Sequence, residues 1–127
     1  MAKIFIIDDD PDIVNLLKMS FENRYHEVAF AHNGNEGLKV IGEFNPDIVV
    51  LDVMMERKDE GFDVARALKN DQKYKNIPIL MLTGIKNDLG FDFKKEAGDI
   101  RWLPVDAYID KSEDLELIVS KAEELLS

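Results

Sequence analysis

Short apolar runs alternate along the chain with stretches whose apolar residues recur at helical spacing. The run Ile4–Ile7 is β-branched and aromatic, as expected of a strand buried on both faces, and Ile48–Leu51 is the clearest run of this kind. Together with three further runs they predict a sheet of five strands. The other three predicted strands are Glu27–Ala31, Pro78–Leu82 and Ala107–Ile109.

The stretches between these runs predict amphipathic helices, each with one apolar face. Asp10 is predicted to cap the first helix and Pro11 to occupy its first position. The second helix is predicted over Asn33–Phe44, with Asn33 as its cap, and Ser112 is predicted to cap the last helix. The residues predicted to face the core are Ile13, Leu16, Leu17 and Phe21 in the first helix, Leu38 and Ile41 in the second, Phe62, Ala65, Ala67 and Leu68 in the third, and Leu115, Ile118, Val119, Ala122 and Leu126 in the last.

Strands that alternate with helices favour an α/β fold, in which a parallel sheet has right-handed crossovers and helices on both faces. Ligands of such folds bind beyond the carboxyl ends of the strands. The residues directly after each apolar run are therefore the candidates for chemistry, although the runs themselves do not give the strand order. These residues are Asp8, Asp9, Asp10, Asp52, Thr83, Asp110 and Lys111.

Composition narrows the function classes. The 127 residues fit one domain spanning 1–127, and a net charge of −10 disfavours direct binding to nucleic acid or to anionic membranes. The absence of cysteine excludes disulfides, thiolate metal sites and cysteine nucleophiles. No apolar run approaches the roughly 20 residues of a membrane span. Acidic residues follow the first apolar run too early for a signal peptide, so we expect a cytoplasmic protein.

Asp8, Asp9 and Asp52 converge on one sheet edge if the first and third strands are neighbours. Like charges that close resist joint ionisation, and a divalent cation with a preference for oxygen ligands, such as Mg²⁺, relieves the conflict. The alternative is that these are solvated loop aspartates or helix caps, which is the favoured interpretation for Asp10 alone. A carboxylate beside Mg²⁺ can attack a phosphoryl group and form an acyl phosphate. Lys111 and Thr83 also lie at predicted strand ends, where they could supply the cation and the hydroxyl that a phosphoryl group at this site would need. Each of them alone is weak evidence for such a site.

Four segments in order resemble the receiver domain of two-component response regulators, and the resemblance covers nearly the whole chain. It implies a flavodoxin-like fold with strand order 2-1-3-4-5. It also implies a signalling domain rather than an ordinary enzyme, one that assists only its own phosphorylation and dephosphorylation. The segments are Ile6–Pro11, Pro46–Met55, Pro78–Thr83 and Ala107–Lys111.

The resemblance implies that Asp52 accepts a phosphoryl group from a histidine kinase, a phosphotransfer protein or a small phosphodonor. Asp8 and Asp9 would hold Mg²⁺ together with Asp52 and the main-chain carbonyl of Met54.

The same resemblance assigns a switch to the ends of the fourth and fifth strands. Thr83 would bond one phosphoryl oxygen and Lys111 would pair with another, while Tyr108 occupies the position of an aromatic ring that moves on activation. Plain core packing is the alternative for Tyr108. The expected partners are the kinase and an unknown downstream protein, with a phosphorylation-dependent homodimer as a further arrangement.

Several positions depart from the family pattern. Glu56 stands where a proline is usual, and Gly61 lies one residue later than usual. Ser112 replaces a proline that usually follows the lysine in a cis bond. Because a cis bond before any other residue costs about 2.5–4 kcal/mol, we predict a trans Lys111–Ser112 bond.

The segment at about residues 84–106 is longer than usual for the family. Its aromatic residues would either anchor the segment to the body of the domain or form a surface for partner docking. They are Phe91, Phe93 and Trp102.

The same residues disfavour two other functions. A phosphatase of the haloacid dehalogenase kind needs a second Asp where Met54 stands, and a flavin domain needs a neutral loop in place of Asp8–Asp10. A receiver-like interaction module that works without phosphorylation remains an alternative. His26 and His32 are interpreted as surface histidines.

Overall fold

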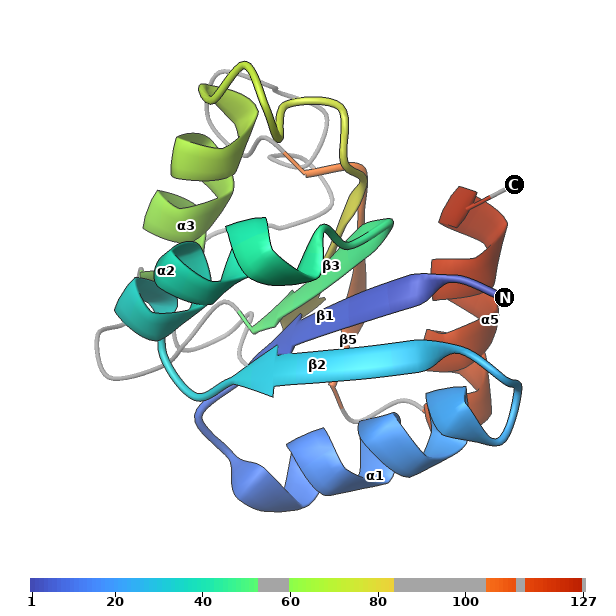
Figure 1. The fold of residues 1–127 in the computed structure, drawn as a ribbon. Helices are drawn as coiled ribbons and strands as arrows, with labels where there is room; N and C mark the ends of the chain where they lie inside the picture. The colour runs from blue at the N-terminus through green and yellow to red at the C-terminus, as the bar shows by residue number, and fades with distance from the viewer. Residues whose placement is uncertain (53–59, 84–104, 112–113, 127) are drawn as a thin grey trace.

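A computed structural model describes residues 1–52, 60–83, 105–111 and 114–126 of the chain (Figure 1). These residues form five strands and four helices. The strands are β1 (Lys3–Ile7), β2 (Glu27–Ala31), β3 (Ile48–Asp52), β4 (Ile79–Thr83) and β5 (Ala107–Asp110). The helices are α1 (Pro11–Glu22), α2 (Gly34–Phe44), α3 (Glu60–Lys69) and α5 (Leu115–Leu126).

The strands form one parallel sheet in the order β2-β1-β3-β4-β5, as the family resemblance implies. Ile7 pairs with Leu51 between β1 and β3, and Thr83 pairs with Asp110 between β4 and β5. The carboxyl ends of the four strands β1, β3, β4 and β5 therefore lie side by side along one edge of the sheet.

Alternate residues of each strand enter two separate cores. Phe5 and Ile7 pack with α2 and α3 on one face, whereas Ile4 and Ile6 pack with α1 and α5 on the other (Figure 1). This explains why β1, β3 and β4 are continuous apolar runs, since both faces of a parallel sheet are covered. In the described part of the chain, no helix is both long and apolar enough to cross a membrane.

The predicted helix faces are partly wrong. Leu16 is 46% exposed because the buried stripe of α1 runs through Val14, Leu17 and Phe21. Leu38 is 39% exposed, and Ala67 also faces solvent.

A close approach of α2 to the sheet explains the exposure of Leu38. A Cβ atom added at Gly37 would lie 2.7 Å from Cδ1 of Ile7, so the helix backbone itself lies against β1. The glycine, and not the neighbouring leucine, therefore faces the sheet at this turn of the helix.

Two of the three predicted helix caps are confirmed. The carboxylate of Asp10 accepts from the amide of Asp12, and Asn33 caps α2. The last helix begins at Leu115, where Asp114 accepts the amide hydrogen of Glu116 at 3.0 Å, so the cap is Asp114 rather than the predicted Ser112.

Three further predictions lie outside the described residues. They are the trans bond before Ser112, the role of Glu56, and most of the lengthened segment, with its residues Phe91, Phe93 and Trp102. All three stay predictions.

Candidate functional site

The structure brings the three predicted carboxylates together. Asp8 directly follows β1, Asp52 ends β3, and these two strands are paired, so both side chains reach the same edge of the sheet. One carboxylate oxygen from each of Asp8, Asp9 and Asp52 lies within 4.8 Å of the others. Asp8 is 0% and Asp52 2% exposed, whereas Asp9 lies at the exposed mouth of the cluster.

The ammonium group of Lys111 contacts two of the three carboxylates. It directly follows β5, and its Nζ atom lies 3.0 Å from Oδ2 of Asp52 and 3.2 Å from Oδ2 of Asp8. Burial alone would lower the pKa of Lys111, but the charges of Asp52 and Asp8 outweigh it and raise the pKa above its ordinary value. Lys111 is therefore a fixed positive charge against two buried carboxylates.

One buried oxygen of the cluster receives no hydrogen bond from the residues that the structure describes. The amide of Asp10 donates to Oδ1 of Asp8 at 2.9 Å, and Lys111 donates to the same oxygen at 3.4 Å and to Asp52. The other oxygen of Asp8, Oδ2, is buried and has the ion pair with Lys111 but no hydrogen bond among the described residues. A buried carboxylate oxygen left in this state is a ready ligand for a cation.

The charge of the cluster also acts on its exposed member. Partial burial and then the neighbouring charge of Asp8 raise the pKa of Asp9 above its ordinary value. Among the described residues, three carboxylates face one lysine and leave a surplus of negative charge, and an oxygen-only donor set of this kind suits Mg²⁺.

Thr83 and Tyr108 lie on the neighbouring strands. Thr83 ends β4, is 5% exposed, and its carbonyl accepts the amide hydrogen of Lys111 at 2.6 Å. Tyr108 is half-buried in β5 and packs against the core that contains α2 and α3. Met54, the predicted carbonyl ligand, lies outside the described residues.

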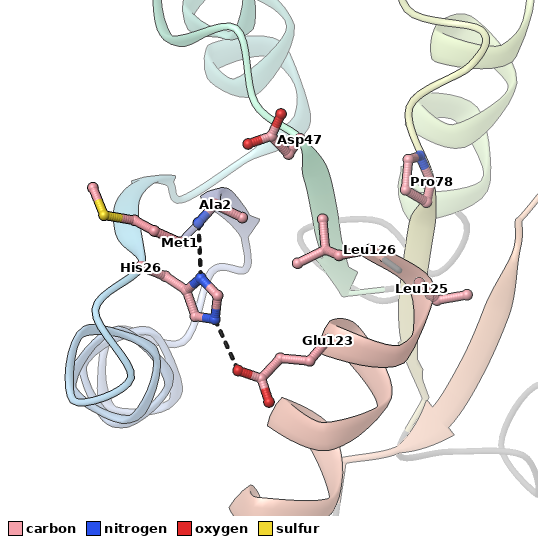
Figure 2. Close-up of a pocket in the computed structure, with 8 residues that line it drawn as sticks. All are labelled: Met1, Ala2, His26, Asp47, Pro78, Glu123, Leu125 and Leu126. Atoms are coloured by element: carbon pink, nitrogen blue, oxygen red, sulfur yellow. Dashed lines mark hydrogen bonds and ion pairs between the residues drawn. The ribbon is translucent and has the colours of Figure 1, made fainter.

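The prediction that both histidines lie at the surface is wrong for His26. Its side chain is only 7% exposed. Nδ1 accepts from the amide of Ala2 at 3.0 Å, and Nε2 lies 2.9 Å from Oε2 of Glu123 in α5 (Figure 2). Apolar periodicity does not reveal such a contact, because it joins residues 97 positions apart.

An open pocket of about 610 Å³ lies beside His26 at the other edge of the sheet (Figure 2). Its lining includes Ala2, Asp47 and Pro78, which precede β1, β3 and β4. The acidic cluster lies at the opposite, carboxyl ends of the same strands. This pocket is therefore separate from the candidate site.

The sequence pattern also does not identify His32 as a neighbour of the site. It follows β2, is half-buried, and its Nδ1 lies 3.3 Å from the main-chain carbonyl oxygen of Asp8. No local sequence motif signals this contact, because the main-chain oxygen lies 24 residues away in the sequence.

Comparison with known proteins agrees with this geometry. The sequence matches the response regulator receiver domain family over residues 4–123. It is 34% identical over 130 residues to the DNA-binding dual master transcriptional regulator RpaA of Synechocystis sp., covering 99% of this chain and 49% of that protein. It is 35% identical over 107 residues to the response regulator PleD of Caulobacter vibrioides, covering 83% of this chain and 23% of that protein.

A solved structure of the chemotaxis protein CheY4 of Vibrio cholerae has the same fold, with a TM-score of 0.82 and 24% identity over 98% of both chains. The present chain spans about half the length of RpaA and about a quarter of PleD. The family match and these identities, together with the acidic edge of a 2-1-3-4-5 sheet, show that the chain belongs to the response regulator receiver domain family of two-component systems.

Proposed function

We propose that Asp52 is the phosphoacceptor of a two-component phosphorelay. The phosphoryl group would come from a phosphohistidine of a histidine kinase or phosphotransfer protein, or from a small phosphodonor. The observation that carries the proposal is the environment of Asp52, whose buried carboxylate lies within 4.8 Å of two others and 3.0 Å from the ammonium of Lys111.

The proposed transfer is a displacement at phosphorus. A carboxylate oxygen of Asp52 forms the new P–O bond while the P–N bond to the donor imidazole breaks, and the imidazole nitrogen keeps the electron pair. The product is an aspartyl phosphate, whose phosphoryl group carries about −1.5 to −2 charges in place of the single charge of the carboxylate. Lys111 already faces Asp52, so its ammonium can pair with a phosphoryl oxygen with little reorganisation.

Asp8, Asp9 and Asp52 fit a bound Mg²⁺, and the family resemblance adds the carbonyl of Met54. The fit rests on the close approach of the three carboxylates and on the buried Oδ2 of Asp8 that has no hydrogen bond among the described residues. When bound, Mg²⁺ supplies positive charge that neutralises the oxygens of the incoming phosphoryl group.

The switch would act through the ends of β4 and β5. In our proposal Thr83 turns its hydroxyl to a phosphoryl oxygen, a contact available only in the phosphorylated state, as a population shift requires. Tyr108 would then turn into the space that Thr83 leaves. The surface around β4 and β5 would change for a downstream protein or for a second copy of the chain.

Incubation with acetyl phosphate and Mg²⁺, followed by intact-mass measurement, tests the proposal. We expect one phosphoryl adduct that disappears in EDTA and in Asp52→Asn. The matched control is Asp47→Asn, at the opposite edge of the sheet, which should keep the adduct. A folded wild type that never gains the adduct would instead favour an interaction module that works without phosphorylation.

A further inference from the structure

The main-chain amide and carbonyl of Asp8 both contact the end of β2 and the residue that follows it. The amide of Asp8 donates to the carbonyl of Ala31 at 3.1 Å, and the carbonyl of Asp8 lies 3.3 Å from Nδ1 of His32. The ring of His32 lies against Phe30, with centroids 5.3 Å apart at 56°. The imidazole is therefore restrained by the ring of Phe30, which lies in β2.

The chemistry of this contact fixes the tautomer of His32. A carbonyl oxygen can only accept a hydrogen bond, so Nδ1 must carry the proton. His26 has the opposite requirement, because its Nδ1 accepts from the amide of Ala2 and its Nε2 must donate to Glu123. In their neutral forms the two histidines therefore require opposite tautomers to make these contacts.

The carbonyl of Asp8 belongs to the peptide plane that leads into Asp9. A hydrogen bond to that oxygen limits rotation of the plane, and the plane sets the direction in which the Asp9 side chain leaves the main chain. The carboxylate of Asp8 is aimed separately by the amide of Asp10. Both acidic residues therefore depend on the main-chain geometry to which His32 contributes.

We propose that His32 is a positioning residue for the cation site, which holds the Asp8–Asp9 peptide plane so that both carboxylates converge on Asp52. The inference rests on the proposed function, since it assumes that Mg²⁺ binds there. His32 itself is not a ligand in this proposal. It contacts the main chain of a ligand residue rather than the ion. Loss of a group that orients metal ligands typically weakens metal binding about 10- to 100-fold.

The tautomers can be measured without metal. A long-range ¹H–¹⁵N spectrum of the imidazoles at about pH 8.5, well above the ordinary histidine pKa of about 6.5, reports which ring nitrogen carries the proton. We expect Nδ1–H for His32 and Nε2–H for His26. Nε2–H for His32 would overturn the inference, whether or not any variant folds.

Mg²⁺ titrations followed through the backbone amides of Asp8 and Asp9 test the consequence. His32→Ala should weaken Mg²⁺ binding about tenfold, the low end of the range for such partners. His32→Asn, whose side-chain amide can donate from a position close to Nδ1, should restore most of the affinity. His26→Ala, at the other edge of the sheet, is the matched control and should leave the affinity unchanged.

The outcomes separate the two claims. Wild-type protein that shows no Mg²⁺-dependent shifts contradicts the proposed function. Wild type that binds Mg²⁺ while His32→Ala binds it equally well contradicts only the positioning role. Equal loss in His32→Ala and His32→Asn would also contradict that role, because the retained donor should then have rescued binding.

Discussion

Lys111 supplies positive charge to the two buried carboxylates of the site. Replacing it with methionine leaves the buried carboxylates of Asp8 and Asp52 facing each other without a cation. We expect Lys111→Met to lower the free energy of unfolding by about 1–3 kcal/mol in EDTA, measured by urea denaturation.

The matched control for that variant is Lys18→Met. Lys18 pairs with Glu22 one helical turn away, and both side chains are well exposed. Exposed pairs of this kind contribute about 0.3–0.5 kcal/mol. Similar losses in the two variants would contradict the idea that Lys111 neutralises a buried cluster.

Glu123 links α5 to the start of β2 and carries a pH dependence. The hydrogen bond with His26, and after it the charge of Arg24, lowers the pKa of Glu123 below its ordinary value of 4.5. A carboxyl whose pKa falls on folding stabilises the fold above its unfolded pKa and loses that contribution as the pH falls through its folded pKa.

The expected result is therefore a stability difference between wild type and Glu123→Gln that is full above about pH 4.5 and shrinks below it. Urea unfolding at a series of pH values measures this difference. A difference that grows on acidification would show that the sign is wrong.

Among the elements, α2 owes its position to one glycine. An alanine at position 37 would place its Cβ 2.7 Å from Cδ1 of the fully buried Ile7. Overpacking of a core costs about 1–3 kcal/mol, which exceeds the gain of about 0.5–1 kcal/mol from a better helix former. We predict that Gly37→Ala lowers the free energy of unfolding by about 1 kcal/mol.

A double-mutant cycle with Ile7→Val tests the cause. Valine lacks the Cδ1 atom that the new methyl group meets, so the loss from Gly37→Ala should be smaller in the Ile7→Val background. Additive losses would show that the close approach is not the origin of the effect.

The strands were largely predictable because both faces of the central strands are covered. Burial on both sides leaves continuous apolar runs, such as Ile48–Leu51, that periodicity detects without tertiary information. Helix faces were less predictable. Leu16 and Leu17 are equally apolar, and only the packing of α1 against the sheet and α5 decides that Leu17 is buried and Leu16 is not.

The same contrast holds at the site. The shared location of Asp8, Asp52, Thr83 and Lys111 was predictable, because each lies at the end of an apolar run and parallel strands end at one edge. The contribution of His32 was not predictable, because its contact is with a main-chain oxygen 24 residues away.

The whole molecule carries a net charge of −10, and its buried acidic cluster adds local repulsion to that surplus. A ligand that binds only the folded state stabilises it by RT ln(1 + [L]/Kd), about 2.7 kcal/mol at 100 times Kd. We therefore expect Mg²⁺ to raise the free energy of unfolding more than NaCl does at equal ionic strength. Asp8→Asn should abolish the Mg²⁺-specific part and keep the general salt effect, and equal effects of the two salts on wild type would contradict a specific site.

The central claim is that the acidic edge makes Asp52 the phosphoacceptor, and chemical trapping of the phosphorylated residue tests it most directly. Borohydride reduces an acyl phosphate at an aspartate to homoserine, and tandem mass spectrometry of the peptides then locates the converted position. After treatment with acetyl phosphate and Mg²⁺, we predict conversion at position 52 alone. Conversion at another aspartate, or none in protein that is folded and loaded with Mg²⁺, would contradict the account.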